Sequence, residues 1–329
     1  MKPTTVLVTG GAGYIGSHMV KTLLEAGHGV VTLDNLGGGF RDSVRGGSFI
    51  EGDISDSQLV ARVLRKHEVS AVMHFASFIQ VGESVTNPGK YYRNNLADTV
   101  LLIETMRACA VQKFIFSSSA AVYGEPEMVP IPETHPKSPV NAYGRTKWMV
   151  EQMLSDLDRA GDFRSVSLRY FNAAGADPSG ILGERHEPET HLIPLVLRVA
   201  LGMAPNIKIF GCDYDTPDGT CIRDYVHVVD LCQAHLLALN SLLEGGESAA
   251  FNLGNGRGFS VREVVETAGR VTGRDIPTFV APRRPGDPAR LVADSSLVRE
   301  RLNWQPRYER LATIIEHAWV WAQRRNSVV

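Results

Sequence analysis

The chain has 329 residues, 43 % of them hydrophobic, and its 34 basic and 36 acidic side chains give a formal net charge of −2 at pH 7. This length allows one large α/β domain or two smaller ones that share an interface. Because acids and bases are mixed along the whole chain, a partner that needs a strongly charged surface, such as nucleic acid or anionic lipid, is excluded.

The first predicted elements, in residues 6–28, are a β-strand, a glycine turn and an amphipathic helix. Gly10, Gly13 and Gly16 recur at three-residue spacing in the turn. Glycine permits a tight turn and a close approach of backbone to pyrophosphate, and the helix N-terminus attracts phosphate. Asp34 closes the next β-run, where a carboxylate would bind the adenosine ribose and repel a 2′-phosphate. The pattern predicts NAD rather than NADP; a structural turn with a solvated Asp34 is the alternative.

Short β-rich runs alternate with helical patterns as far as residue 172. The runs are "GVVTLDN", "SFIEGDI", "AVMHFAS", "KFIFSSS" and "SVSLRYFN". This alternation predicts βαβ units in a Rossmann-type, doubly wound parallel sheet, with ligands beyond the carboxyl ends of the strands. Asp53 and Ile54 end the third run and are expected beside an adenine ring, unless they form a plain turn.

A tyrosine and a lysine lie four residues apart in "NAYGRTKWMVEQ", residues 141–152. On a helix this spacing puts Tyr143 and Lys147 on one face. A phenol titrates near 10, so a base near pH 7 needs roughly 4 kcal/mol of electrostatic help, which an ammonium group and a positive nicotinamide ring supply. Ser119 ends the strand before this helix and offers a hydroxyl to the reacting oxygen. Chance spacing and an ordinary strand end are the alternatives.

Beyond Asn172 the chain becomes rich in long loops, which are more typical of a lid or substrate wall than of simple connectors. We expect a smaller, interleaved C-terminal α/β substrate domain. Its predicted ranges are 173–225 and 254–329, and those of the NAD-binding domain are 1–172 and 226–253. Arg223 and Arg284 lie in these loops, and arginine suits a buried diphosphate.

The four cysteines form no C-x-x-C pair and show no metal-ligand spacing. We therefore expect free thiols in a reducing compartment and no metal site. No apolar run approaches the roughly 20 residues of a membrane span, and the N-terminus lacks the pattern of a signal peptide. The sequence predicts a soluble, cytoplasmic protein.

A resemblance covering essentially the whole chain rests on stretches such as "VTGGAGYIGSH", "YYRNN", "FIFSSSAAVYGE", "YGRTK", "LRYFNAAGADPSG", "GTCIRDYVHVVDL" and "LNWQP". In these the chain closely resembles the UDP-galactose 4-epimerases, which are extended short-chain dehydrogenases/reductases. The resemblance implies an isomerase of galactose metabolism that holds NAD tightly and interconverts UDP-galactose and UDP-glucose through a 4-keto sugar. It also implies that Tyr143 removes the 4-hydroxyl proton, that Lys147 lowers the pKa of Tyr143 and binds the nicotinamide ribose, and that Ser119 holds the 4-oxygen.

The same resemblance implies further binding residues. Besides the glycines, the cofactor positions are Tyr14, Ile15, Asp34, Asn35, Asp53, Ile54, Phe75, Asn94, Tyr143, Lys147 and Phe171. Besides Ser119 and Tyr143, the positions for the UDP-hexose are Asn172, Leu192, Arg223, Arg284 and Asp287.

Three positions depart from the relatives' pattern. Ile79 stands where a lysine commonly reaches the cofactor phosphate, and His191 stands where some relatives have asparagine. A lone loop histidine is more often solvated. Leu291 stands where relatives vary between a large aromatic and a small residue, so we expect partial tolerance of N-acetylated sugars.

Two other functions are alternatives to this interpretation. A nucleotide-sugar 4,6-dehydratase shares the fold, but it places acidic residues after the strand-end hydroxyl, where this chain has Ala120 and Ala121. A non-catalytic dinucleotide sensor would have no reason to keep Tyr143, Lys147 and Ser119 together. The resemblance also implies a homodimer formed by the helical segments "PGKYYRNNLADTVLLIETMRACA" and "YGRTKWMVEQMLSDL".

Overall fold

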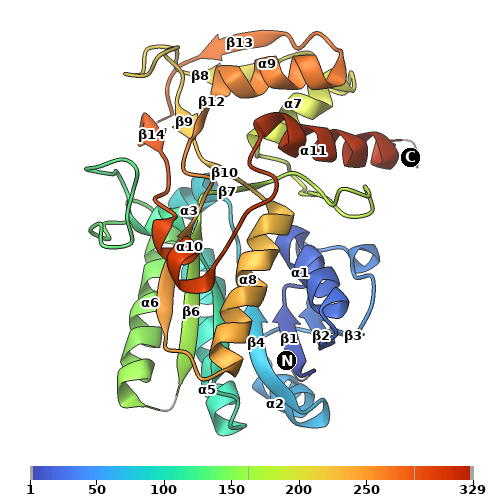
Figure 1. The fold of residues 1–329 in the computed structure, drawn as a ribbon, viewed down its shortest axis with the longest axis vertical. Helices are drawn as coiled ribbons and strands as arrows, with labels where there is room; N and C mark the ends of the chain where they lie inside the picture. Colours follow the sequence, from blue (N-terminus) through green and yellow to red (C-terminus); the bar gives the residue numbers. More distant parts are fainter. Residues whose placement is uncertain (1–2, 162, 285, 327–329) are drawn as a thin grey trace.

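The computed structural model describes residues 3–161, 163–284 and 286–326. Its largest element is a seven-stranded sheet in the order β11-β6-β5-β4-β1-β2-β3, in which all neighbours are parallel (Figure 1). The strands are β1 (Thr5–Thr9), β2 (Gly29–Asp34), β3 (Ser48–Glu51), β4 (Val69–His74), β5 (Lys113–Ser119), β6 (Arg164–Tyr170) and β11 (Ala249–Leu253). The predicted Rossmann-type sheet is confirmed, and its order reverses between β1 and β4, where such sheets bind ligands.

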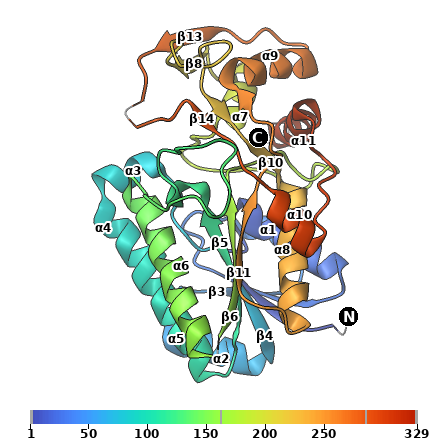
Figure 2. The same ribbon diagram turned by 60° about the vertical axis from the view of Figure 1, so that its left-hand side comes forward.

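Helices cover both faces of this sheet (Figure 2). On one face lie α1 (Tyr14–Glu25) and α8 (Val228–Leu243), and on the other lie α2 (Ser57–Lys66), α5 (Asp98–Ala108) and α6 (Ala142–Ala160). A hydrophobic core lies on each face of the sheet, and successive side chains of β1 point into the two cores alternately. Val6 and Val8 pack on the α1/α8 side, and Leu7 packs on the other. Burial on both faces explains why these strands read as continuous apolar runs.

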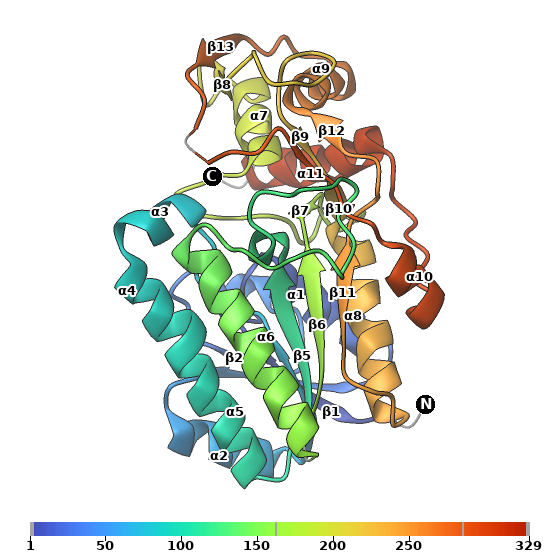
Figure 3. The same cartoon turned by 90° about the vertical axis from the view of Figure 1, so that its left-hand side faces the viewer.

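Helix α6, which carries Tyr143 and Lys147, has clear signals at both ends. The Asn141 side chain accepts a hydrogen bond from the Gly144 amide at 2.8 Å and so caps the first turn. Gly161 ends the helix with φ of 94°, a left-handed conformation that favours glycine. Tyr143 is thereby fixed in the first turn, at the end of the helix that lies beside the carboxyl ends of the strands (Figure 3).

The segment expected as one long helix from residue 88 to 110 is divided. After α3 (Val81–Thr86) come α4 (Pro88–Tyr91), a π-helical turn (Tyr92–Ala97) and then α5. Buried Asn95 lies in the π turn, where its side chain accepts from the Phe78 amide and donates to the Phe78 carbonyl, both at 2.9 Å. A buried amide must be satisfied in this way, and π turns are frequent at functional sites.

A smaller α/β unit lies beyond the carboxyl ends of the sheet (Figure 1). Its core is formed mainly by α7 (Leu192–Ala200), α9 (Val261–Thr272) and α11 (Leu311–Asn326). Its short strands are β8 (Ile207–Phe210) with β13 (Thr278–Ala281), and β9 (Ile222–Arg223) with β12 (Phe259–Ser260) and β14 (Arg290–Leu291). Two short 3₁₀ turns, Arg41–Ser43 and Ala120–Val122, complete the irregular elements.

The chain crosses between the two units along β7 (Asn172–Ala174) and β10 (Tyr225–His227), which pair in parallel. These strands coincide with the junctions expected at residues 172 and 226. Helix α10 (Ser296–Leu302) differs from the expected boundaries, because Val298 and the following Trp304 pack in the core between the sheet and α8. Within the described residues, no helix is both long and apolar enough to cross a bilayer.

Candidate active site

The glycine turn is closed so tightly that side chains are excluded from it. Gly10 has φ of +72°, and a Cβ there would lie 2.5 Å from the Ala76 amide nitrogen in the loop after β4. A Cβ on Gly16 would lie 2.1 Å from the Gly10 carbonyl oxygen. Gly13 caps α1 without a side-chain hydrogen bond, so the first amides of the helix keep their donors for a ligand. The turn therefore fits a pyrophosphate group.

Asp34, at the end of β2, stabilises this turn through hydrogen bonds. Its two carboxylate oxygens accept hydrogen bonds from the amides of Ala12 and Leu36, both at 2.8 Å. Burial raises the pKa of Asp34, and the two amides lower it in part. Since each carboxylate oxygen has two lone pairs, capacity remains for a ribose hydroxyl. The structural and the ligand-binding interpretations of Asp34 are thus compatible.

The residues expected around the adenine end lie on adjacent strand ends. Asn35 follows β2 and donates from its side chain to Asp53 Oδ2 at 2.7 Å, and Ile54 next to Asp53 is buried. Phe75 follows β4 and donates its amide to the Thr9 carbonyl at 2.9 Å. These contacts bring the residues to the sheet edge predicted for the cofactor.

Three further residues expected to bind the cofactor, Tyr14, Ile15 and Asn94, contact other parts of the protein. The Tyr14 hydroxyl donates to the Gly175 carbonyl at 2.7 Å, so it joins α1 to the second unit, and the adjacent Ile15 packs against the core beside α8. Asn94, in the π turn, donates to the side chain of Asn95 at 2.8 Å. Ile79 is 39 % exposed, so the position where relatives carry lysine supplies no cation.

Tyr143, Lys147 and Ser119 come together at the carboxyl end of β5. Their exposed fractions are 8 %, 1 % and 9 %. Lys147 Nζ donates to Ser77 Oγ and to the Ser117 carbonyl, both at 2.8 Å, and lies 5.8 Å from the centre of the Tyr143 ring. The predicted convergence on one face of α6 is therefore present.

The electrostatics differ from the expectation that Lys147 depresses the pKa of Tyr143. Burial raises the pKa of Tyr143, and a hydrogen bond with Ser119 lowers it in part. Burial lowers the pKa of Lys147 to about 7, although the charge of Glu151 opposes this change. Desolvation is the largest cause of both shifts, and it disfavours the charged form of each group. Further positive charge beside Tyr143 is needed to make it a phenolate at neutral pH.

A buried network below these residues was missed in the sequence. Arg169 Nε, on β6, donates to both carboxylate oxygens of Glu151 at 3.0 Å, and Ser118 donates to the same carboxylate. Glu151 follows Lys147 by four residues, so helical spacing was a signal that could have found it. Ser77 lies on another element, and nothing in its local pattern pointed to Lys147.

The expected substrate residues gather on the short strands above the sheet. Arg223, on β9, forms an ion pair with Asp287, and Arg284 lies 4.0 Å above the ring of Phe210. Asn172, at the start of β7, donates from its side chain to the Asp224 carbonyl at 2.8 Å. Both arginines thus come from the loop regions predicted to form a substrate wall.

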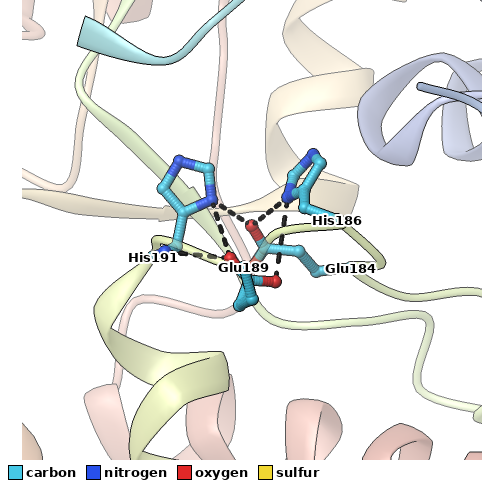
Figure 4. Close-up of side chains that lie close together, drawn as sticks. All are labelled: Glu184, His186, Glu189 and His191. Carbon is cyan, nitrogen blue, oxygen red and sulfur yellow. Dashed lines mark hydrogen bonds and ion pairs between the residues drawn. The ribbon is translucent and has the colours of Figure 1, made fainter. Parts of the chain in front are cut away.

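Four positions remain: the last substrate residue, Leu192, the cofactor residue Phe171, and Leu291 and His191, which depart from the relatives' pattern. Leu192 begins α7 and packs against the core of the second unit. Phe171 and Leu291 each pack against the small apolar cluster next to Ser119, which includes Ala120 and Val122. His191 was expected to be solvated, and its side chain is 43 % exposed, but its Nδ1 lies among Glu184, His186 and Glu189 (Figure 4). The signal in the sequence was the spacing of these four residues, which lie within seven positions of one another.

Comparisons with known proteins extend over nearly the whole chain. The model of the NAD dependent epimerase/dehydratase family matches residues 6–254. A UDP-glucose 4-epimerase of Halalkalibacterium halodurans is 52 % identical over 316 residues, which are 96 % of this chain and 95 % of that protein.

Solved structures are similarly close. UDP-glucose 4-epimerase from Brucella ovis in complex with NAD is 50 % identical, with a TM-score of 0.94 over 96 % of this chain and 97 % of that one. UDP-glucose 4-epimerase from Bifidobacterium longum in complex with NAD⁺ and UDP is 39 % identical, with a TM-score of 0.94 over 99 % of this chain and 100 % of that one.

Proposed function

The chain belongs to the NAD dependent epimerase/dehydratase family, and on this premise we propose that it interconverts UDP-galactose and UDP-glucose by inverting C4 of the hexose. The observation that carries the proposal is the convergence of Tyr143, Lys147 and Ser119 beside the glycine turn. The full-length similarity to UDP-glucose 4-epimerases supports the same reaction.

In this proposal the protein supplies acid–base chemistry and orientation. The Tyr143 hydroxyl is the group that exchanges a proton with the sugar 4-hydroxyl, and Ser119 Oγ hydrogen-bonds that oxygen. NAD held by the glycine turn would supply the hydride acceptor and donor at C4, and its positive ring would favour the phenolate of Tyr143. Lys147, fixed by Ser77 and the Ser117 carbonyl, adds a second positive charge when protonated.

Two groups of residues are proposed to bind the ligands. The amides of the Gly10–Gly16 turn and the Asp34 carboxylate hold the dinucleotide. Arg223 and Arg284 hold the diphosphate of the substrate, because burying about two negative charges requires fixed cations. The ion pair between Arg223 and Asp287 keeps that guanidinium oriented before the substrate arrives.

A single assay tests both the reaction and the cofactor. Purified protein is incubated with UDP-galactose and no added NAD, and UDP-glucose is expected to form. Tyr143→Phe is expected to lower kcat by at least about a hundredfold, the usual contribution of a general base, while its NAD content stays unchanged. Tyr308→Phe, in the second unit, is the matched control and is expected to retain activity.

Other outcomes of this assay would support the rival functions. A product that lacks the 6-hydroxyl would indicate a 4,6-dehydratase, and absence of turnover in the wild type with NAD bound would favour a sensor. Activity that survives Tyr143→Phe would contradict the role proposed for the tyrosine.

We also propose that the protein is a homodimer that pairs through α5 and α6, and that it acts in the cytoplasm. Leu101 on α5 and Met149 on α6 are each 39 % exposed on helices that otherwise cover the sheet. Exposed apolar side chains on neighbouring helices are typical of an interface. Light scattering at micromolar concentration is expected to give twice the mass of one chain, and a monomer would contradict the proposal.

A further inference from the structure

Two glutamates and two histidines meet in the loop between β7 and α7 (Figure 4). One ligand atom of each of Glu184, His186, Glu189 and His191 lies within 4.8 Å of all the others. His186 Nδ1 lies 3.2 Å from Glu184 Oε1 and 3.8 Å from Glu189 Oε2. His191 Nδ1 lies 2.5 Å from Glu184 Oε1 and 3.5 Å from Glu189 Oε1.

These polar atoms are buried without adequate hydrogen bonds. The side chains of Glu184 and Glu189 are only 7 % and 3 % exposed. Within the described part of the chain, Glu184 Oε1 and the Nδ1 atoms of His186 and His191 are buried and have no partner outside the cluster, so they contact only one another and Glu189. Two buried carboxylates side by side are costly unless positive charge compensates them. The positive charge that these carboxylates need must come from a bound cation or from a proton on each histidine.

We propose that Glu184, His186, Glu189 and His191 form a four-coordinate binding site for a divalent transition-metal ion, with zinc as the best fit. Imidazole nitrogen and carboxylate oxygen are ordinary zinc ligands at about 2.0–2.2 Å, and a tetrahedron of that size has edges of about 3.3–3.6 Å. Three of the four atom pairs described above, at 3.2, 3.5 and 3.8 Å, lie around this length, and the fourth, His191 Nδ1 to Glu184 Oε1 at 2.5 Å, would have to lengthen around a bound ion. Two carboxylates and two neutral imidazoles also balance the charge of a divalent cation.

One ligand is already held in place by the backbone. Glu189 Oε1 accepts hydrogen bonds from the amides of Thr190 and His191, at 2.8 and 2.9 Å. These contacts orient the carboxylate and leave Oε2 facing His186, while His191 Nδ1 lies 3.5 Å from Oε1. Outer contacts of this kind are usual at metal sites, where they reduce the cost of ordering the ligand.

The position of the cluster indicates a structural role. Four protein ligands leave no open coordination position for a substrate, unlike a catalytic zinc site. The Glu184 carbonyl accepts a hydrogen bond from Trp321 of α11 at 3.0 Å, and the His186 ring packs edge-on against the Tyr14 ring, 6.3 Å between centres. Bound metal would thus hold the loop between the second unit and the glycine-turn helix, and fix the start of α7 at Leu192.

Metal analysis of protein purified without a histidine tag tests the proposal. About one zinc per chain is expected in wild type, and substantially less in Glu189→Gln and His186→Gln. Glu187→Gln is the matched control, because Glu187 is an exposed residue of the same loop outside the cluster, and it is expected to keep the metal.

A second measurement covers the case in which a variant folds poorly. Wild-type protein stripped by a chelator is expected to show a lower melting temperature, to recover it with one equivalent of Zn²⁺, and to give the visible spectrum of tetrahedral Co²⁺. Wild type without metal and without any response to Zn²⁺ would overturn the proposal and favour a cluster of protonated histidines and carboxylates. Equal metal content in wild type and both ligand variants would overturn it as well.

Discussion

Lys147 Nζ lies 2.8 Å from Ser77 Oγ, so a hydrogen bond joins the first turns of α6 to the loop after β4. The serine stabilises the ammonium form of a lysine that burial brings to a pKa of about 7. Ser77 also fixes where the positive charge lies relative to Tyr143. It is therefore a positioning residue that acts through Lys147.

We expect Ser77→Ala to lower kcat by about 10- to 100-fold with little change in KM, because a hydrogen bond to a charged group contributes about 1.5–3 kcal/mol. Loss of the acceptor disfavours the ammonium form, so the pKa of Lys147 falls and the alkaline limb of the kcat–pH profile moves to lower pH. Ser296→Ala, on the exposed surface of α10, is the control. A variant with reduced kcat and an unshifted profile would argue for a merely structural serine.

Gly16→Ala is expected to yield protein with little or no bound NAD. The new Cβ would lie 2.1 Å from the Gly10 carbonyl, and a backbone atom cannot give way as a flexible side chain can. The turn must open, which displaces the amides proposed to hold the pyrophosphate. Absorbance and mass spectrometry of the denatured protein measure the cofactor content. Gly82→Ala places a methyl group in open space and should leave that content unchanged; a full NAD complement in Gly16→Ala would refute the proposed cradle.

The sheet could be predicted because it depends on local signals. Runs such as the one from Val6 to Val8 are apolar at every position, which is typical of strands buried on both faces, and Asn141 and Gly161 mark the ends of α6. The π turn was missed because it depends on a tertiary contact between Asn95 and Phe78. Helix α10 was misplaced because its packing partners lie in α8 and β11, far away in the sequence.

The site was predicted as a set of residues but not as an electrostatic environment. The four-residue spacing of Tyr143 and Lys147 was enough to predict that they lie on one face of a helix. Their pKa values, in contrast, depend on how much water the fold excludes. The cluster around His191 could not be recognised from one histidine, because its meaning depends on how a loop folds back on itself.

Replacing only one partner of the buried ion pair between Glu151 and Arg169 is expected to lower the free energy of unfolding strongly. Both side chains are 5 % exposed, so Glu151→Leu leaves an uncompensated guanidinium and should destabilise the NAD-loaded protein by about 3–5 kcal/mol. The double variant Glu151→Leu/Arg169→Met removes both charges, so it should lose clearly less stability than Glu151→Leu does. Midpoints of urea unfolding measure the difference.

A surface pair provides the comparison for this prediction. Asp156 and Arg159 are ion-paired on the exposed side of α6, where such pairs contribute about 0–1 kcal/mol, so Arg159→Met should change the midpoint little. If the double variant lost as much stability as Glu151→Leu and Arg169→Met lose in sum when each is made alone, the two buried charges would not be compensating each other.

Leu291 is expected to set the tolerance for an N-acetyl group on the sugar. It pairs in register with Arg223 and, like Phe171, packs against the cluster next to Ser119, so it lies between the proposed diphosphate and reaction sites. We expect the wild type to turn over UDP-N-acetylglucosamine more slowly than UDP-galactose. Leu291→Tyr should abolish the turnover of UDP-N-acetylglucosamine, and Leu291→Ala should raise that turnover relative to the turnover of UDP-galactose. Changes of about 10- to 200-fold correspond to the 1–3 kcal/mol available from small differences in pocket size.

The ratio of kcat/KM for the two sugars, measured on each variant, separates this effect from general damage. Turnover of UDP-galactose serves as the internal control, because a misfolded variant loses both activities together. If the ratio were the same in wild type, Leu291→Tyr and Leu291→Ala, this side chain would not face the sugar. Discrimination would then have to come from other residues on β14 or from the start of α7.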